Sequence, residues 1–297
     1  FCATVHRREC TKMRKFMEKA MHVVFFIAAI ASIIAVFLIC LFLFVNGIPA
    51  MGEIGIFDFL LGTKWAPSNN PPSFGIFPMI LGSIYVTAGA IVIGVPIGIL
   101  TSVFMAKYCP KKMYKVLKPA TELLAGIPSV VYGFFGLVVI VPLIRSLAGG
   151  TGNSILAASI LLGIMILPTI IGVSESAIRS VPESYYEGSL ALGATHERTI
   201  FRVMLPAAKS GIMAGIVLGI GRAIGETMAV IMVAGNQARM PAGLLKGIRT
   251  LTANIVIEMG YAADLHREAL IATGVVLFVF ILIINVAFSL LKRKESK

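Results

Sequence analysis

The stretch from Ser210 to Asn236 reads SGIMAGIVLGIGRAIGETMAVIMVAGN and contains only two charged side chains. These are Arg222, near its middle, and Glu226, about one helical turn later. A guanidinium or a carboxylate inside a membrane span costs about 2.5–3.5 kcal/mol on translocon scales, so such a residue indicates a functional site. The spacing of four places Arg222 and Glu226 on one helix face, where the two can pair.

The same helix face carries glycines at intervals of four residues. At about 100° per residue, Gly211, Gly215 and Gly219 fall in one arc with Arg222 and Glu226. Glycines spaced in this way let another helix approach closely. We therefore expect the charged pair to point at protein or at a water-filled cavity, and not at lipid.

The composition is that of a protein that crosses a membrane several times. The chain has 297 residues, of which 58% are hydrophobic and 13% are charged. A span needs about 20 predominantly apolar residues, and six windows qualify. These windows are 21–45, 74–106, 119–144, 152–174, 210–237 and 269–291. The sequence thus predicts an all-α integral membrane protein with about six transmembrane helices, in one domain over residues 21–291.

The charge distribution predicts the topology of these spans. The formal net charge is +12, and the basic residues gather before span 1, between spans 2 and 3, between spans 4 and 5, and after span 6. All four places lie on one side of a six-span protein. By the positive-inside rule that side is cytoplasmic, so the N-terminal segment 1–20 and the tail 292–297 are both expected there. The basic surplus indicates a multi-pass protein of the cell membrane and argues against nucleic-acid binding.

The hydrophilic stretch 46–73, between spans 1 and 2, is expected to face outside. It contains the turn-rich sequence WAPSNNPP, in which Trp65 is plausible as an interfacial anchor. A connector is a more economical interpretation of this stretch than a binding loop.

A second hydrophilic stretch, 180–206, lies between spans 4 and 5 on the cytoplasmic side. Ser180 and Glu183 form a capping-box pattern that starts a short helix, and Gly193 is well placed to end it. Thr195 can cap a second helix, which Pro206 would follow. The pattern predicts a helical hairpin on the cytoplasmic face. On physical grounds alone, such a hairpin could equally lie at the lipid interface.

This hairpin resembles the EAA loop of ABC importer permeases. That loop has a glutamate, a glycine six residues later, and an Ile-x-Leu-Pro end whose proline follows the glycine by thirteen residues. Matching positions here are Glu187, Gly193, Leu205 and Pro206. The chain departs from the pattern at Gly188, Ser189 and Val203, with residues of similar size. The resemblance implies a coupling helix that docks into a groove on an ATPase subunit, which is a known recognition mode.

Further segments resemble the phosphate-specific ABC importer permease of the PstC type. They are Glu122–Val138, Ile166–Ile170, Ser189–Thr195 and Gly221–Asn236. The resemblance implies a type I ABC importer permease fold and a substrate of inorganic phosphate. It also implies four kinds of neighbour: membrane lipid, a PstA-like sister permease, two ATP-binding subunits, and an extracellular or periplasmic phosphate-binding protein. ATP and Mg²⁺ would then bind to the partner subunits, with no cofactor or metal on this chain and no enzymatic activity of its own.

Arg222 suits an anionic cargo, because its planar guanidinium grips two oxygens at once and stays charged when buried. Glu226 would neutralise Arg222 in an empty cavity and accept a hydrogen bond from a protonated phosphate oxygen. Fully ionised sulfate lacks that proton, so we expect Glu226 to repel it. Alternatively, the pair only fixes helix packing and never touches cargo.

Several other residues are candidates or neighbours of the pathway. Ser129 and Tyr132 lie where Gly126–Gly133 should break a helix in span 3, although a simple kink is the plainer interpretation. Thr227 could contact cargo or bond its own backbone. Three further residues are expected to make protein contacts: Glu122 with Lys118, Glu175 with Arg179, and His196 within the hairpin.

Three other functions remain to be weighed. A permease for another tetrahedral oxyanion would share every feature above. An ion-coupled secondary transporter should show inverted repeats or more intramembrane acids. A membrane enzyme should show an H-E-x-x-H motif or a convergent catalytic cluster, and this sequence has neither. It also lacks the G-x-x-x-x-G-K-[ST] motif, so ATP would be hydrolysed by partners.

Overall fold

The computed structural model describes the backbone of residues 2–295 and the side chains of residues 17–287 and 290. Within that range almost all regular structure is helical. The long helices are α1 (Cys2–Ile54), α3 (Phe77–Val103), α7 (Ile155–Arg179), α10 (Leu205–Gly225) and α13 (Asp264–Glu295). The shorter ones are α2 (Ile56–Leu61), α4 (Lys111–Gly126), α5 (Ser129–Phe135), α6 (Val141–Ala148), α8 (Glu183–Ala191), α9 (His196–Thr199), α11 (Met228–Val233) and α12 (Leu251–Glu258). Strands β1 (Trp65–Ala66) and β2 (Ser73–Phe74) form one antiparallel hairpin, and π-helical turns η1 (Phe104–Tyr108), η2 (Gly136–Ile140) and η3 (Ile200–Met204) complete the set.

Six helical segments of the described chain are long and apolar enough to cross a membrane, as the sequence predicted. They are Met17–Ile54, Phe77–Tyr108, Ser129–Ala148, Ile155–Arg179, His196–Gly225 and Asp264–Ala287. The all-α class and the number of spans are confirmed. The basic side chains expected at residues 7–15 and 292–297 lie outside those that the structure describes.

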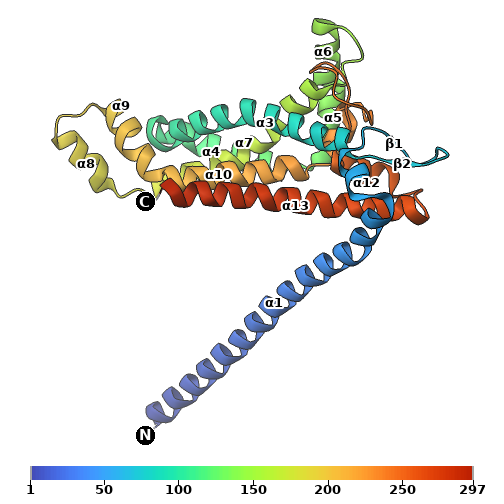
Figure 1. Cartoon of the computed structure of the whole chain (residues 1–297). Coiled ribbons are helices and arrows are strands. Elements are labelled where there is room, and N and C mark those ends of the chain that lie inside the picture. The colour runs from blue at the N-terminus through green and yellow to red at the C-terminus, as the bar shows by residue number, and fades with distance from the viewer. Residues whose placement is uncertain (1, 296–297) are drawn as a thin grey trace.

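Helix α7 is the centre of the bundle. It packs against α3 on one side and α10 on another, and its Leu161, Met165 and Ile166 are fully buried in the main apolar core. Figure 1 shows α3, α7, α10 and α13 side by side, with α8 and α9 projecting from one end and the β-hairpin and α12 at the other. Helix α1 contacts α13 near its own C-terminal end and otherwise stands away from the bundle (Figure 1).

The third and fifth predicted spans differ most from the structure. The third span begins at Ser129 and not at residue 119, because α4 ends at Gly126 and Ile127 adopts an extended backbone before Pro128. A residue that precedes proline is sterically biased away from the helical region. The fifth span ends at Gly225 and not at residue 237.

The stretch 46–73 is more ordered than a turn-rich connector. Helix α1 continues to Ile54, α2 follows, and the β-hairpin encloses the proline-rich turn. Trp65 is not an interfacial anchor: its side chain is only 8% exposed, and its Nε1 donates a 2.7 Å hydrogen bond to Oε2 of Glu258. The buried indole is stabilised in two ways: its ring packs in an apolar cluster, and its N–H has a hydrogen-bond acceptor.

Candidate substrate pathway and coupling hairpin

The Arg222 guanidinium lies at the end of α10 and reaches across to α7. Its Nη1 donates to the Thr169 hydroxyl oxygen at 3.3 Å, and both residues are half-buried. Among the described side chains Arg222 has no carboxylate partner within ion-pair distance. Arg222 is therefore a largely uncompensated positive charge inside the helical bundle, and such a charge is costly unless a cavity or an anion solvates it.

The predicted pairing of Glu226 with Arg222 is wrong. Helix α10 ends at Gly225, and Glu226 has an extended backbone, so the i, i+4 geometry of a continuous helix is lost. The Glu226 carboxylate turns toward α11 instead, where Oε1 accepts a 3.2 Å hydrogen bond from the backbone N–H of Ala229. The Glu226 carbonyl accepts a bond from the Thr252 hydroxyl at 3.1 Å, so the break is fixed on both sides.

The helix break at residues 226–227 lies beside the break at 127–128. Helices α5 and α11, which follow the two breaks, pack against each other, and a Cβ on Gly133 would come 3.0 Å from the Ala229 Cα. Freed backbone groups at such breaks are tolerated in membranes where they face protein or a cavity. The prediction of a break within Gly126–Gly133 is confirmed.

Tyr132 lies in the first turn of α5, directly after the break. The phenol is buried and donates to the Leu124 carbonyl at 2.8 Å, which spans the break between α4 and α5. Ser129 is the first residue of α5. Thr227 donates to the Gly225 carbonyl at 3.3 Å, the backbone alternative that the sequence left open. The hydroxyl hydrogens of Tyr132 and Thr227 are therefore both donated to backbone carbonyls.

The glycine face of α10 packs on α7, as predicted. A Cβ on Gly219 would lie 2.9 Å from Cγ1 of Ile170, and one on Gly215 would lie 3.1 Å from the Ser174 hydroxyl. One on Gly211 would collide with the Ala177 methyl group. This close packing holds α10 against α7 and sets Arg222 within reach of Thr169.

The hairpin of residues 180–206 forms with two corrections. Gly193 ends α8 with a φ of +83°, and the Thr195 hydroxyl caps α9 by accepting from Arg198 N, both as predicted. Ser180 does not cap α8, however; its hydroxyl donates to the Ala177 carbonyl at the end of α7, and Pro182 precedes α8.

The second helix also does not stop at Pro206, since α9, η3 and α10 run on as one span. Proline is tolerated there because it lies in the first turn of α10.

The two arms of the hairpin are joined by side chains. The Tyr186 hydroxyl and Nδ1 of His196 are 2.7 Å apart, and the hydroxyls of Ser189 and Thr199 are 2.9 Å apart. His196 is thus a contact residue, as predicted. Glu187 and the turn residue Leu192 are exposed, with Leu192 91% accessible. Leu205 and Pro206 open α10 at the base of the hairpin.

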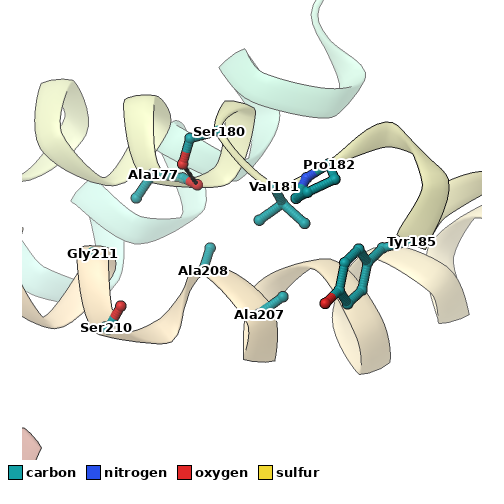
Figure 2. Close-up of a pocket in the computed structure, with 9 residues that line it drawn as sticks. All are labelled: Ala177, Ser180, Val181, Pro182, Tyr185, Ala207, Ala208, Ser210 and Gly211. Carbon is teal, nitrogen blue, oxygen red and sulfur yellow. Dashed lines mark hydrogen bonds between the residues drawn. The ribbon is translucent and has the colours of Figure 1, made fainter.

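A cavity of about 240 Å³ lies where the hairpin leaves the bundle (Figure 2). Its walls come from the end of α7, the start of α8 and the first turns of α10. Small side chains such as Ala177, Ala208 and Ser210 line it, and Tyr185 closes the α8 side.

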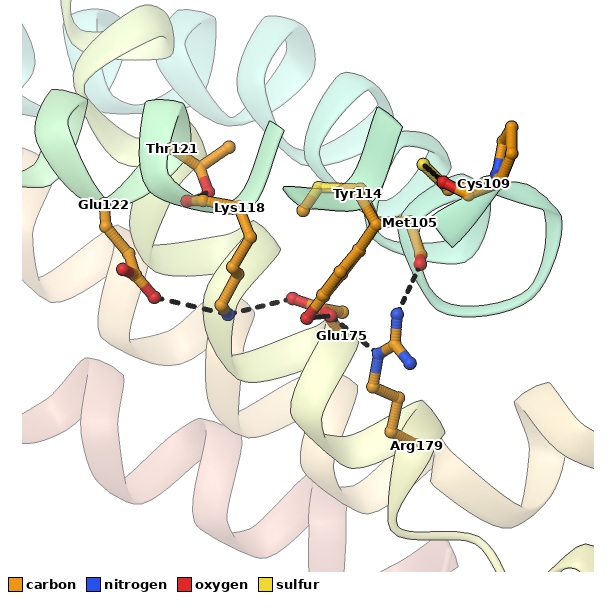
Figure 3. A network of polar contacts seen from close by, with 9 residues as sticks. Met105, Cys109, Tyr114, Lys118, Thr121, Glu122, Glu175 and Arg179 are labelled. Carbon is orange, nitrogen blue, oxygen red and sulfur yellow. Dashed lines mark hydrogen bonds and ion pairs between the residues drawn. The ribbon is translucent and has the colours of Figure 1, made fainter. Parts of the chain in front are cut away.

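A buried carboxylate joins α4 to α7 close to this hairpin (Figure 3). Glu175 is 1% exposed and accepts from Tyr114 Oη at 2.6 Å, Lys118 Nζ at 3.0 Å and Arg179 Nε at 2.7 Å. The predicted pairs of Glu175 with Arg179 and of Glu122 with Lys118 both occur, the latter at 3.8 Å. The hydrogen bond to Glu175 raises the pKa of the Lys118 amine, and likewise raises the pKa of the Tyr114 phenol.

A second polar cluster lies at the opposite end of the molecule, around Glu258. Besides the Trp65 indole, its carboxylate accepts from Arg249 and lies 2.9 Å from Nε2 of His266. Arg249 also donates to the Asn236 carbonyl at 3.1 Å. This cluster ties the β-hairpin and α12 to the start of α13 and to the loop after α11.

Sequence reasoning missed Thr169, Tyr114 and the Glu258 cluster. Two signals could have marked Thr169: it directly follows Pro168, and it lies in the segment Ile166–Ile170 that resembles the phosphate permeases. Glu258 and Trp65 are 193 residues apart, so no local pattern connects them. Among the described side chains, no three His, Cys, Asp or Glu residues are arranged to hold a metal ion.

Comparison with known proteins places this geometry in a family. Residues 94–297 match the family model described as "Binding-protein-dependent transport system inner membrane component". The chain is 42% identical over 266 residues to a probable ABC transporter permease, YqgH, of Bacillus subtilis, covering 86% of each chain. It is 34% identical to the phosphate transport system permease PstC of Mesorhizobium japonicum, covering 91% of this chain and 88% of the relative.

Solved structures share the fold at lower identity. A bacterial alginate ABC transporter, solved in complex with its alginate-bound periplasmic protein, matches with a TM-score of 0.63 and 19% identity over 91% of this chain and 94% of that chain. The MetNI methionine ABC transporter in inward-facing form matches with a TM-score of 0.56 and 22% identity, over 75% and 95%. The chain is a multi-pass membrane protein that belongs to the family of binding-protein-dependent transport system inner membrane components, the permease subunits of ABC importers.

Proposed function

We propose that this chain is the PstC-type permease subunit of an ATP-driven importer that moves inorganic phosphate across the cell membrane by alternating access. The observation that carries the proposal is the position of Arg222. It lies at a helix break inside the bundle, beside Thr169, with no carboxylate partner among the described side chains. A fixed guanidinium with free N–H groups matches a tetrahedral oxyanion in charge and in geometry.

The relatives that share most of the chain support phosphate as the cargo. Proteins from Mesorhizobium japonicum and Methanocaldococcus jannaschii that are 34% and 32% identical are named as phosphate permeases, the second as a probable one. A related tetrahedral anion such as arsenate would meet the same guanidinium. We further propose that the Glu226 carboxylate, although it turns toward α11 and does not pair with Arg222, disfavours sulfate, because it repels a fully ionised anion but accepts a hydrogen bond from protonated phosphate.

The proposed complex contains a PstA-like sister permease, two ATP-binding subunits and a phosphate-binding protein outside the membrane. ATP and Mg²⁺ bind to the ATPase subunits, and this chain carries no cofactor. The hairpin of residues 180–206 serves as the coupling element, since its turn exposes Leu192 and its arms are braced by Tyr186 with His196. ATP-driven closure of the ATPases would move this hairpin and switch the access to Arg222.

The contacts of the hairpin support the proposed orientation in the membrane. Lys107 lies 3.7 Å from Glu183 at the start of α8, so the basic segment 107–118 and the hairpin lie together. A basic segment beside a coupling hairpin suits the cytoplasmic side. Both termini are then cytoplasmic, and the Glu258 cluster faces outside.

Uptake by the reconstituted complex tests this function. Proteoliposomes that hold all four kinds of subunit should accumulate radiolabelled phosphate when ATP is supplied, with inhibition by vanadate and no effect of an uncoupler. Arsenate should compete and sulfate should not. If the uncoupler abolished uptake and vanadate had no effect, the protein would instead be an ion-coupled secondary transporter. ATP-driven uptake of another oxyanion and not of phosphate would change the assigned substrate, while the assignment as an ABC importer permease would stand.

A further inference from the structure

We propose that the Thr169 hydroxyl is a second anion-contacting group, which binds the transported oxyanion together with Arg222. Thr169 lies on α7 and Arg222 on α10, so the site would be shared between two helices of the bundle. The proposal rests on the phosphate-permease function above and adds a residue to its substrate site.

The first step concerns the hydrogen bonds of Thr169. A threonine inside a membrane helix commonly donates its hydroxyl to the carbonyl four residues earlier. Thr101 in α3 does so to Ile97 at 2.8 Å, and Thr273 in α13 does so to Ala269 at 2.9 Å. Thr169 departs from this pattern, since its described hydrogen bond is the one that its oxygen accepts from Arg222.

A hydroxyl that accepts one bond keeps its own hydrogen to donate. At Thr169 that donor lies next to a guanidinium which itself keeps N–H groups beyond the single bond to Thr169. An oxyanion held by Arg222 would therefore find a second donor 3.3 Å from the guanidinium nitrogen, close enough for both to contact neighbouring oxygens of one tetrahedral ion.

The surroundings favour an open site at this position. Thr169 and Arg222 are both half-buried, so an ion can reach them. Gly172, one turn beyond Thr169 on α7, has nothing within 4 Å of the place where a Cβ would lie. The hydroxyls of Tyr132 and Thr227 donate to backbone carbonyls. Of these three hydroxyls, only that of Thr169 contacts Arg222 and keeps its hydrogen free to donate.

The test removes the hydroxyl while keeping the shape of the side chain. In the reconstituted complex, Thr169→Val should raise the KM for radiolabelled phosphate by about tenfold or more, because a hydrogen bond to a charged group is lost. The maximal rate at saturating phosphate should change much less, since the bond serves binding. Thr169→Ser retains the hydroxyl and should restore a KM close to that of wild type.

Thr101→Val is the matched control. It removes a hydroxyl from a half-buried threonine of another span, one that bonds its own backbone, and should leave the KM unchanged. If Thr169→Val does not accumulate, Thr169→Ala removes the same hydroxyl with a smaller side chain. A wild-type KM in the valine or alanine variant would overturn the proposal while phosphate transport stands. Absence of phosphate uptake by wild type would instead overturn the proposed function, and this site with it.

Discussion

Lys118 and Glu175 lie 3.0 Å apart, and this ion pair joins α4 to the end of α7 next to the hairpin of residues 180–206. The carboxylate is almost fully buried, whereas the Lys118 amine retains partial access to solvent. Tyr114 and Arg179 complete the shell around Glu175, and the Arg179 guanidinium stacks over the Tyr114 ring at 4.3 Å. Helix α4 then runs from this junction to the helix break that Tyr132 spans with its bond to the Leu124 carbonyl, so the junction connects the hairpin end of the bundle to that break.

Removing the charge of Glu175 should loosen this junction. Glu175→Gln weakens three hydrogen bonds to charged or phenolic donors, and we expect a loss of about 1–3 kcal/mol in the stability of the purified protein. Glu122→Gln removes only an exposed partner 3.8 Å from Lys118 and should cost less than about 0.5 kcal/mol. Thermal unfolding in detergent measures both. Equal losses in the two variants would contradict the role of the buried carboxylate.

The same junction should make stability depend on alkaline pH. The pKa of Lys118 is raised above its ordinary 10.5 and that of Tyr114 above its ordinary 10.0, both chiefly by the hydrogen bond to Glu175. A raised folded-state pKa contributes stability that is complete below the unfolded-state value and is lost as the pH rises through the folded-state value. We therefore expect the Tm to fall above about pH 10, and to fall less steeply in Glu175→Gln. A Tm that rose over this range would contradict the assigned pairs.

Glu226 should have two separable effects: its carboxylate oxygen holds the start of α11, and its negative charge excludes sulfate. Glu226→Gln keeps an oxygen that can accept from Ala229, so the start of α11 should remain intact, while exclusion of sulfate should be lost. Glu226→Ala also removes the acceptor of the Ala229 N–H in the first turn of α11, at a cost of about 1 kcal/mol. Sulfate competition for phosphate uptake and thermal unfolding separate the two effects. Continued exclusion of sulfate by Glu226→Gln would place selectivity elsewhere, most directly in the binding protein.

The contact between α7 and α10 should tolerate no added methyl group at Gly211. In Gly211→Ala the new Cβ would collide with the Ala177 methyl, and separating the helices should cost about 1–3 kcal/mol. Gly221→Ala adds a methyl to the same helix where nothing lies within 4 Å, and should be neutral or gain up to about 1 kcal/mol. Thermal unfolding compares the pair, and similar values for both would show that the packing is not tight.

Much of this architecture follows from local sequence patterns. Apolar windows predict six spans because their signal depends only on residues within one helix. The glycine spacing on residues 211–219 predicts a packed face, and the pair of Glu175 with Arg179 follows from helical geometry. Gly193 marks a turn because its positive φ is costly for other residues.

The helix break at Glu226 was not predicted, because apolar residues continue on both sides of the short stretch Gly225–Thr227. The break is stabilised by contacts from elsewhere in the chain, namely the Thr252 hydroxyl on the Glu226 carbonyl and the packing of α5 on α11. The partnership of Arg222 with Thr169 likewise depends on how α7 and α10 are placed. Both features determine the geometry of the candidate site, and both depend on tertiary contacts that a local sequence pattern does not reveal.

The most direct test of the central claim is phosphate uptake by the reconstituted complex with Arg222→Ala, compared with wild type at equal membrane abundance. Arg145→Ala, which removes an exposed arginine near the end of α6, serves as the matched control. The account predicts that Arg222→Ala abolishes ATP-driven uptake while Arg145→Ala transports like wild type. Equal transport by Arg222→Ala and wild type would contradict it, and would make Arg222 a packing residue whose charge never meets the cargo.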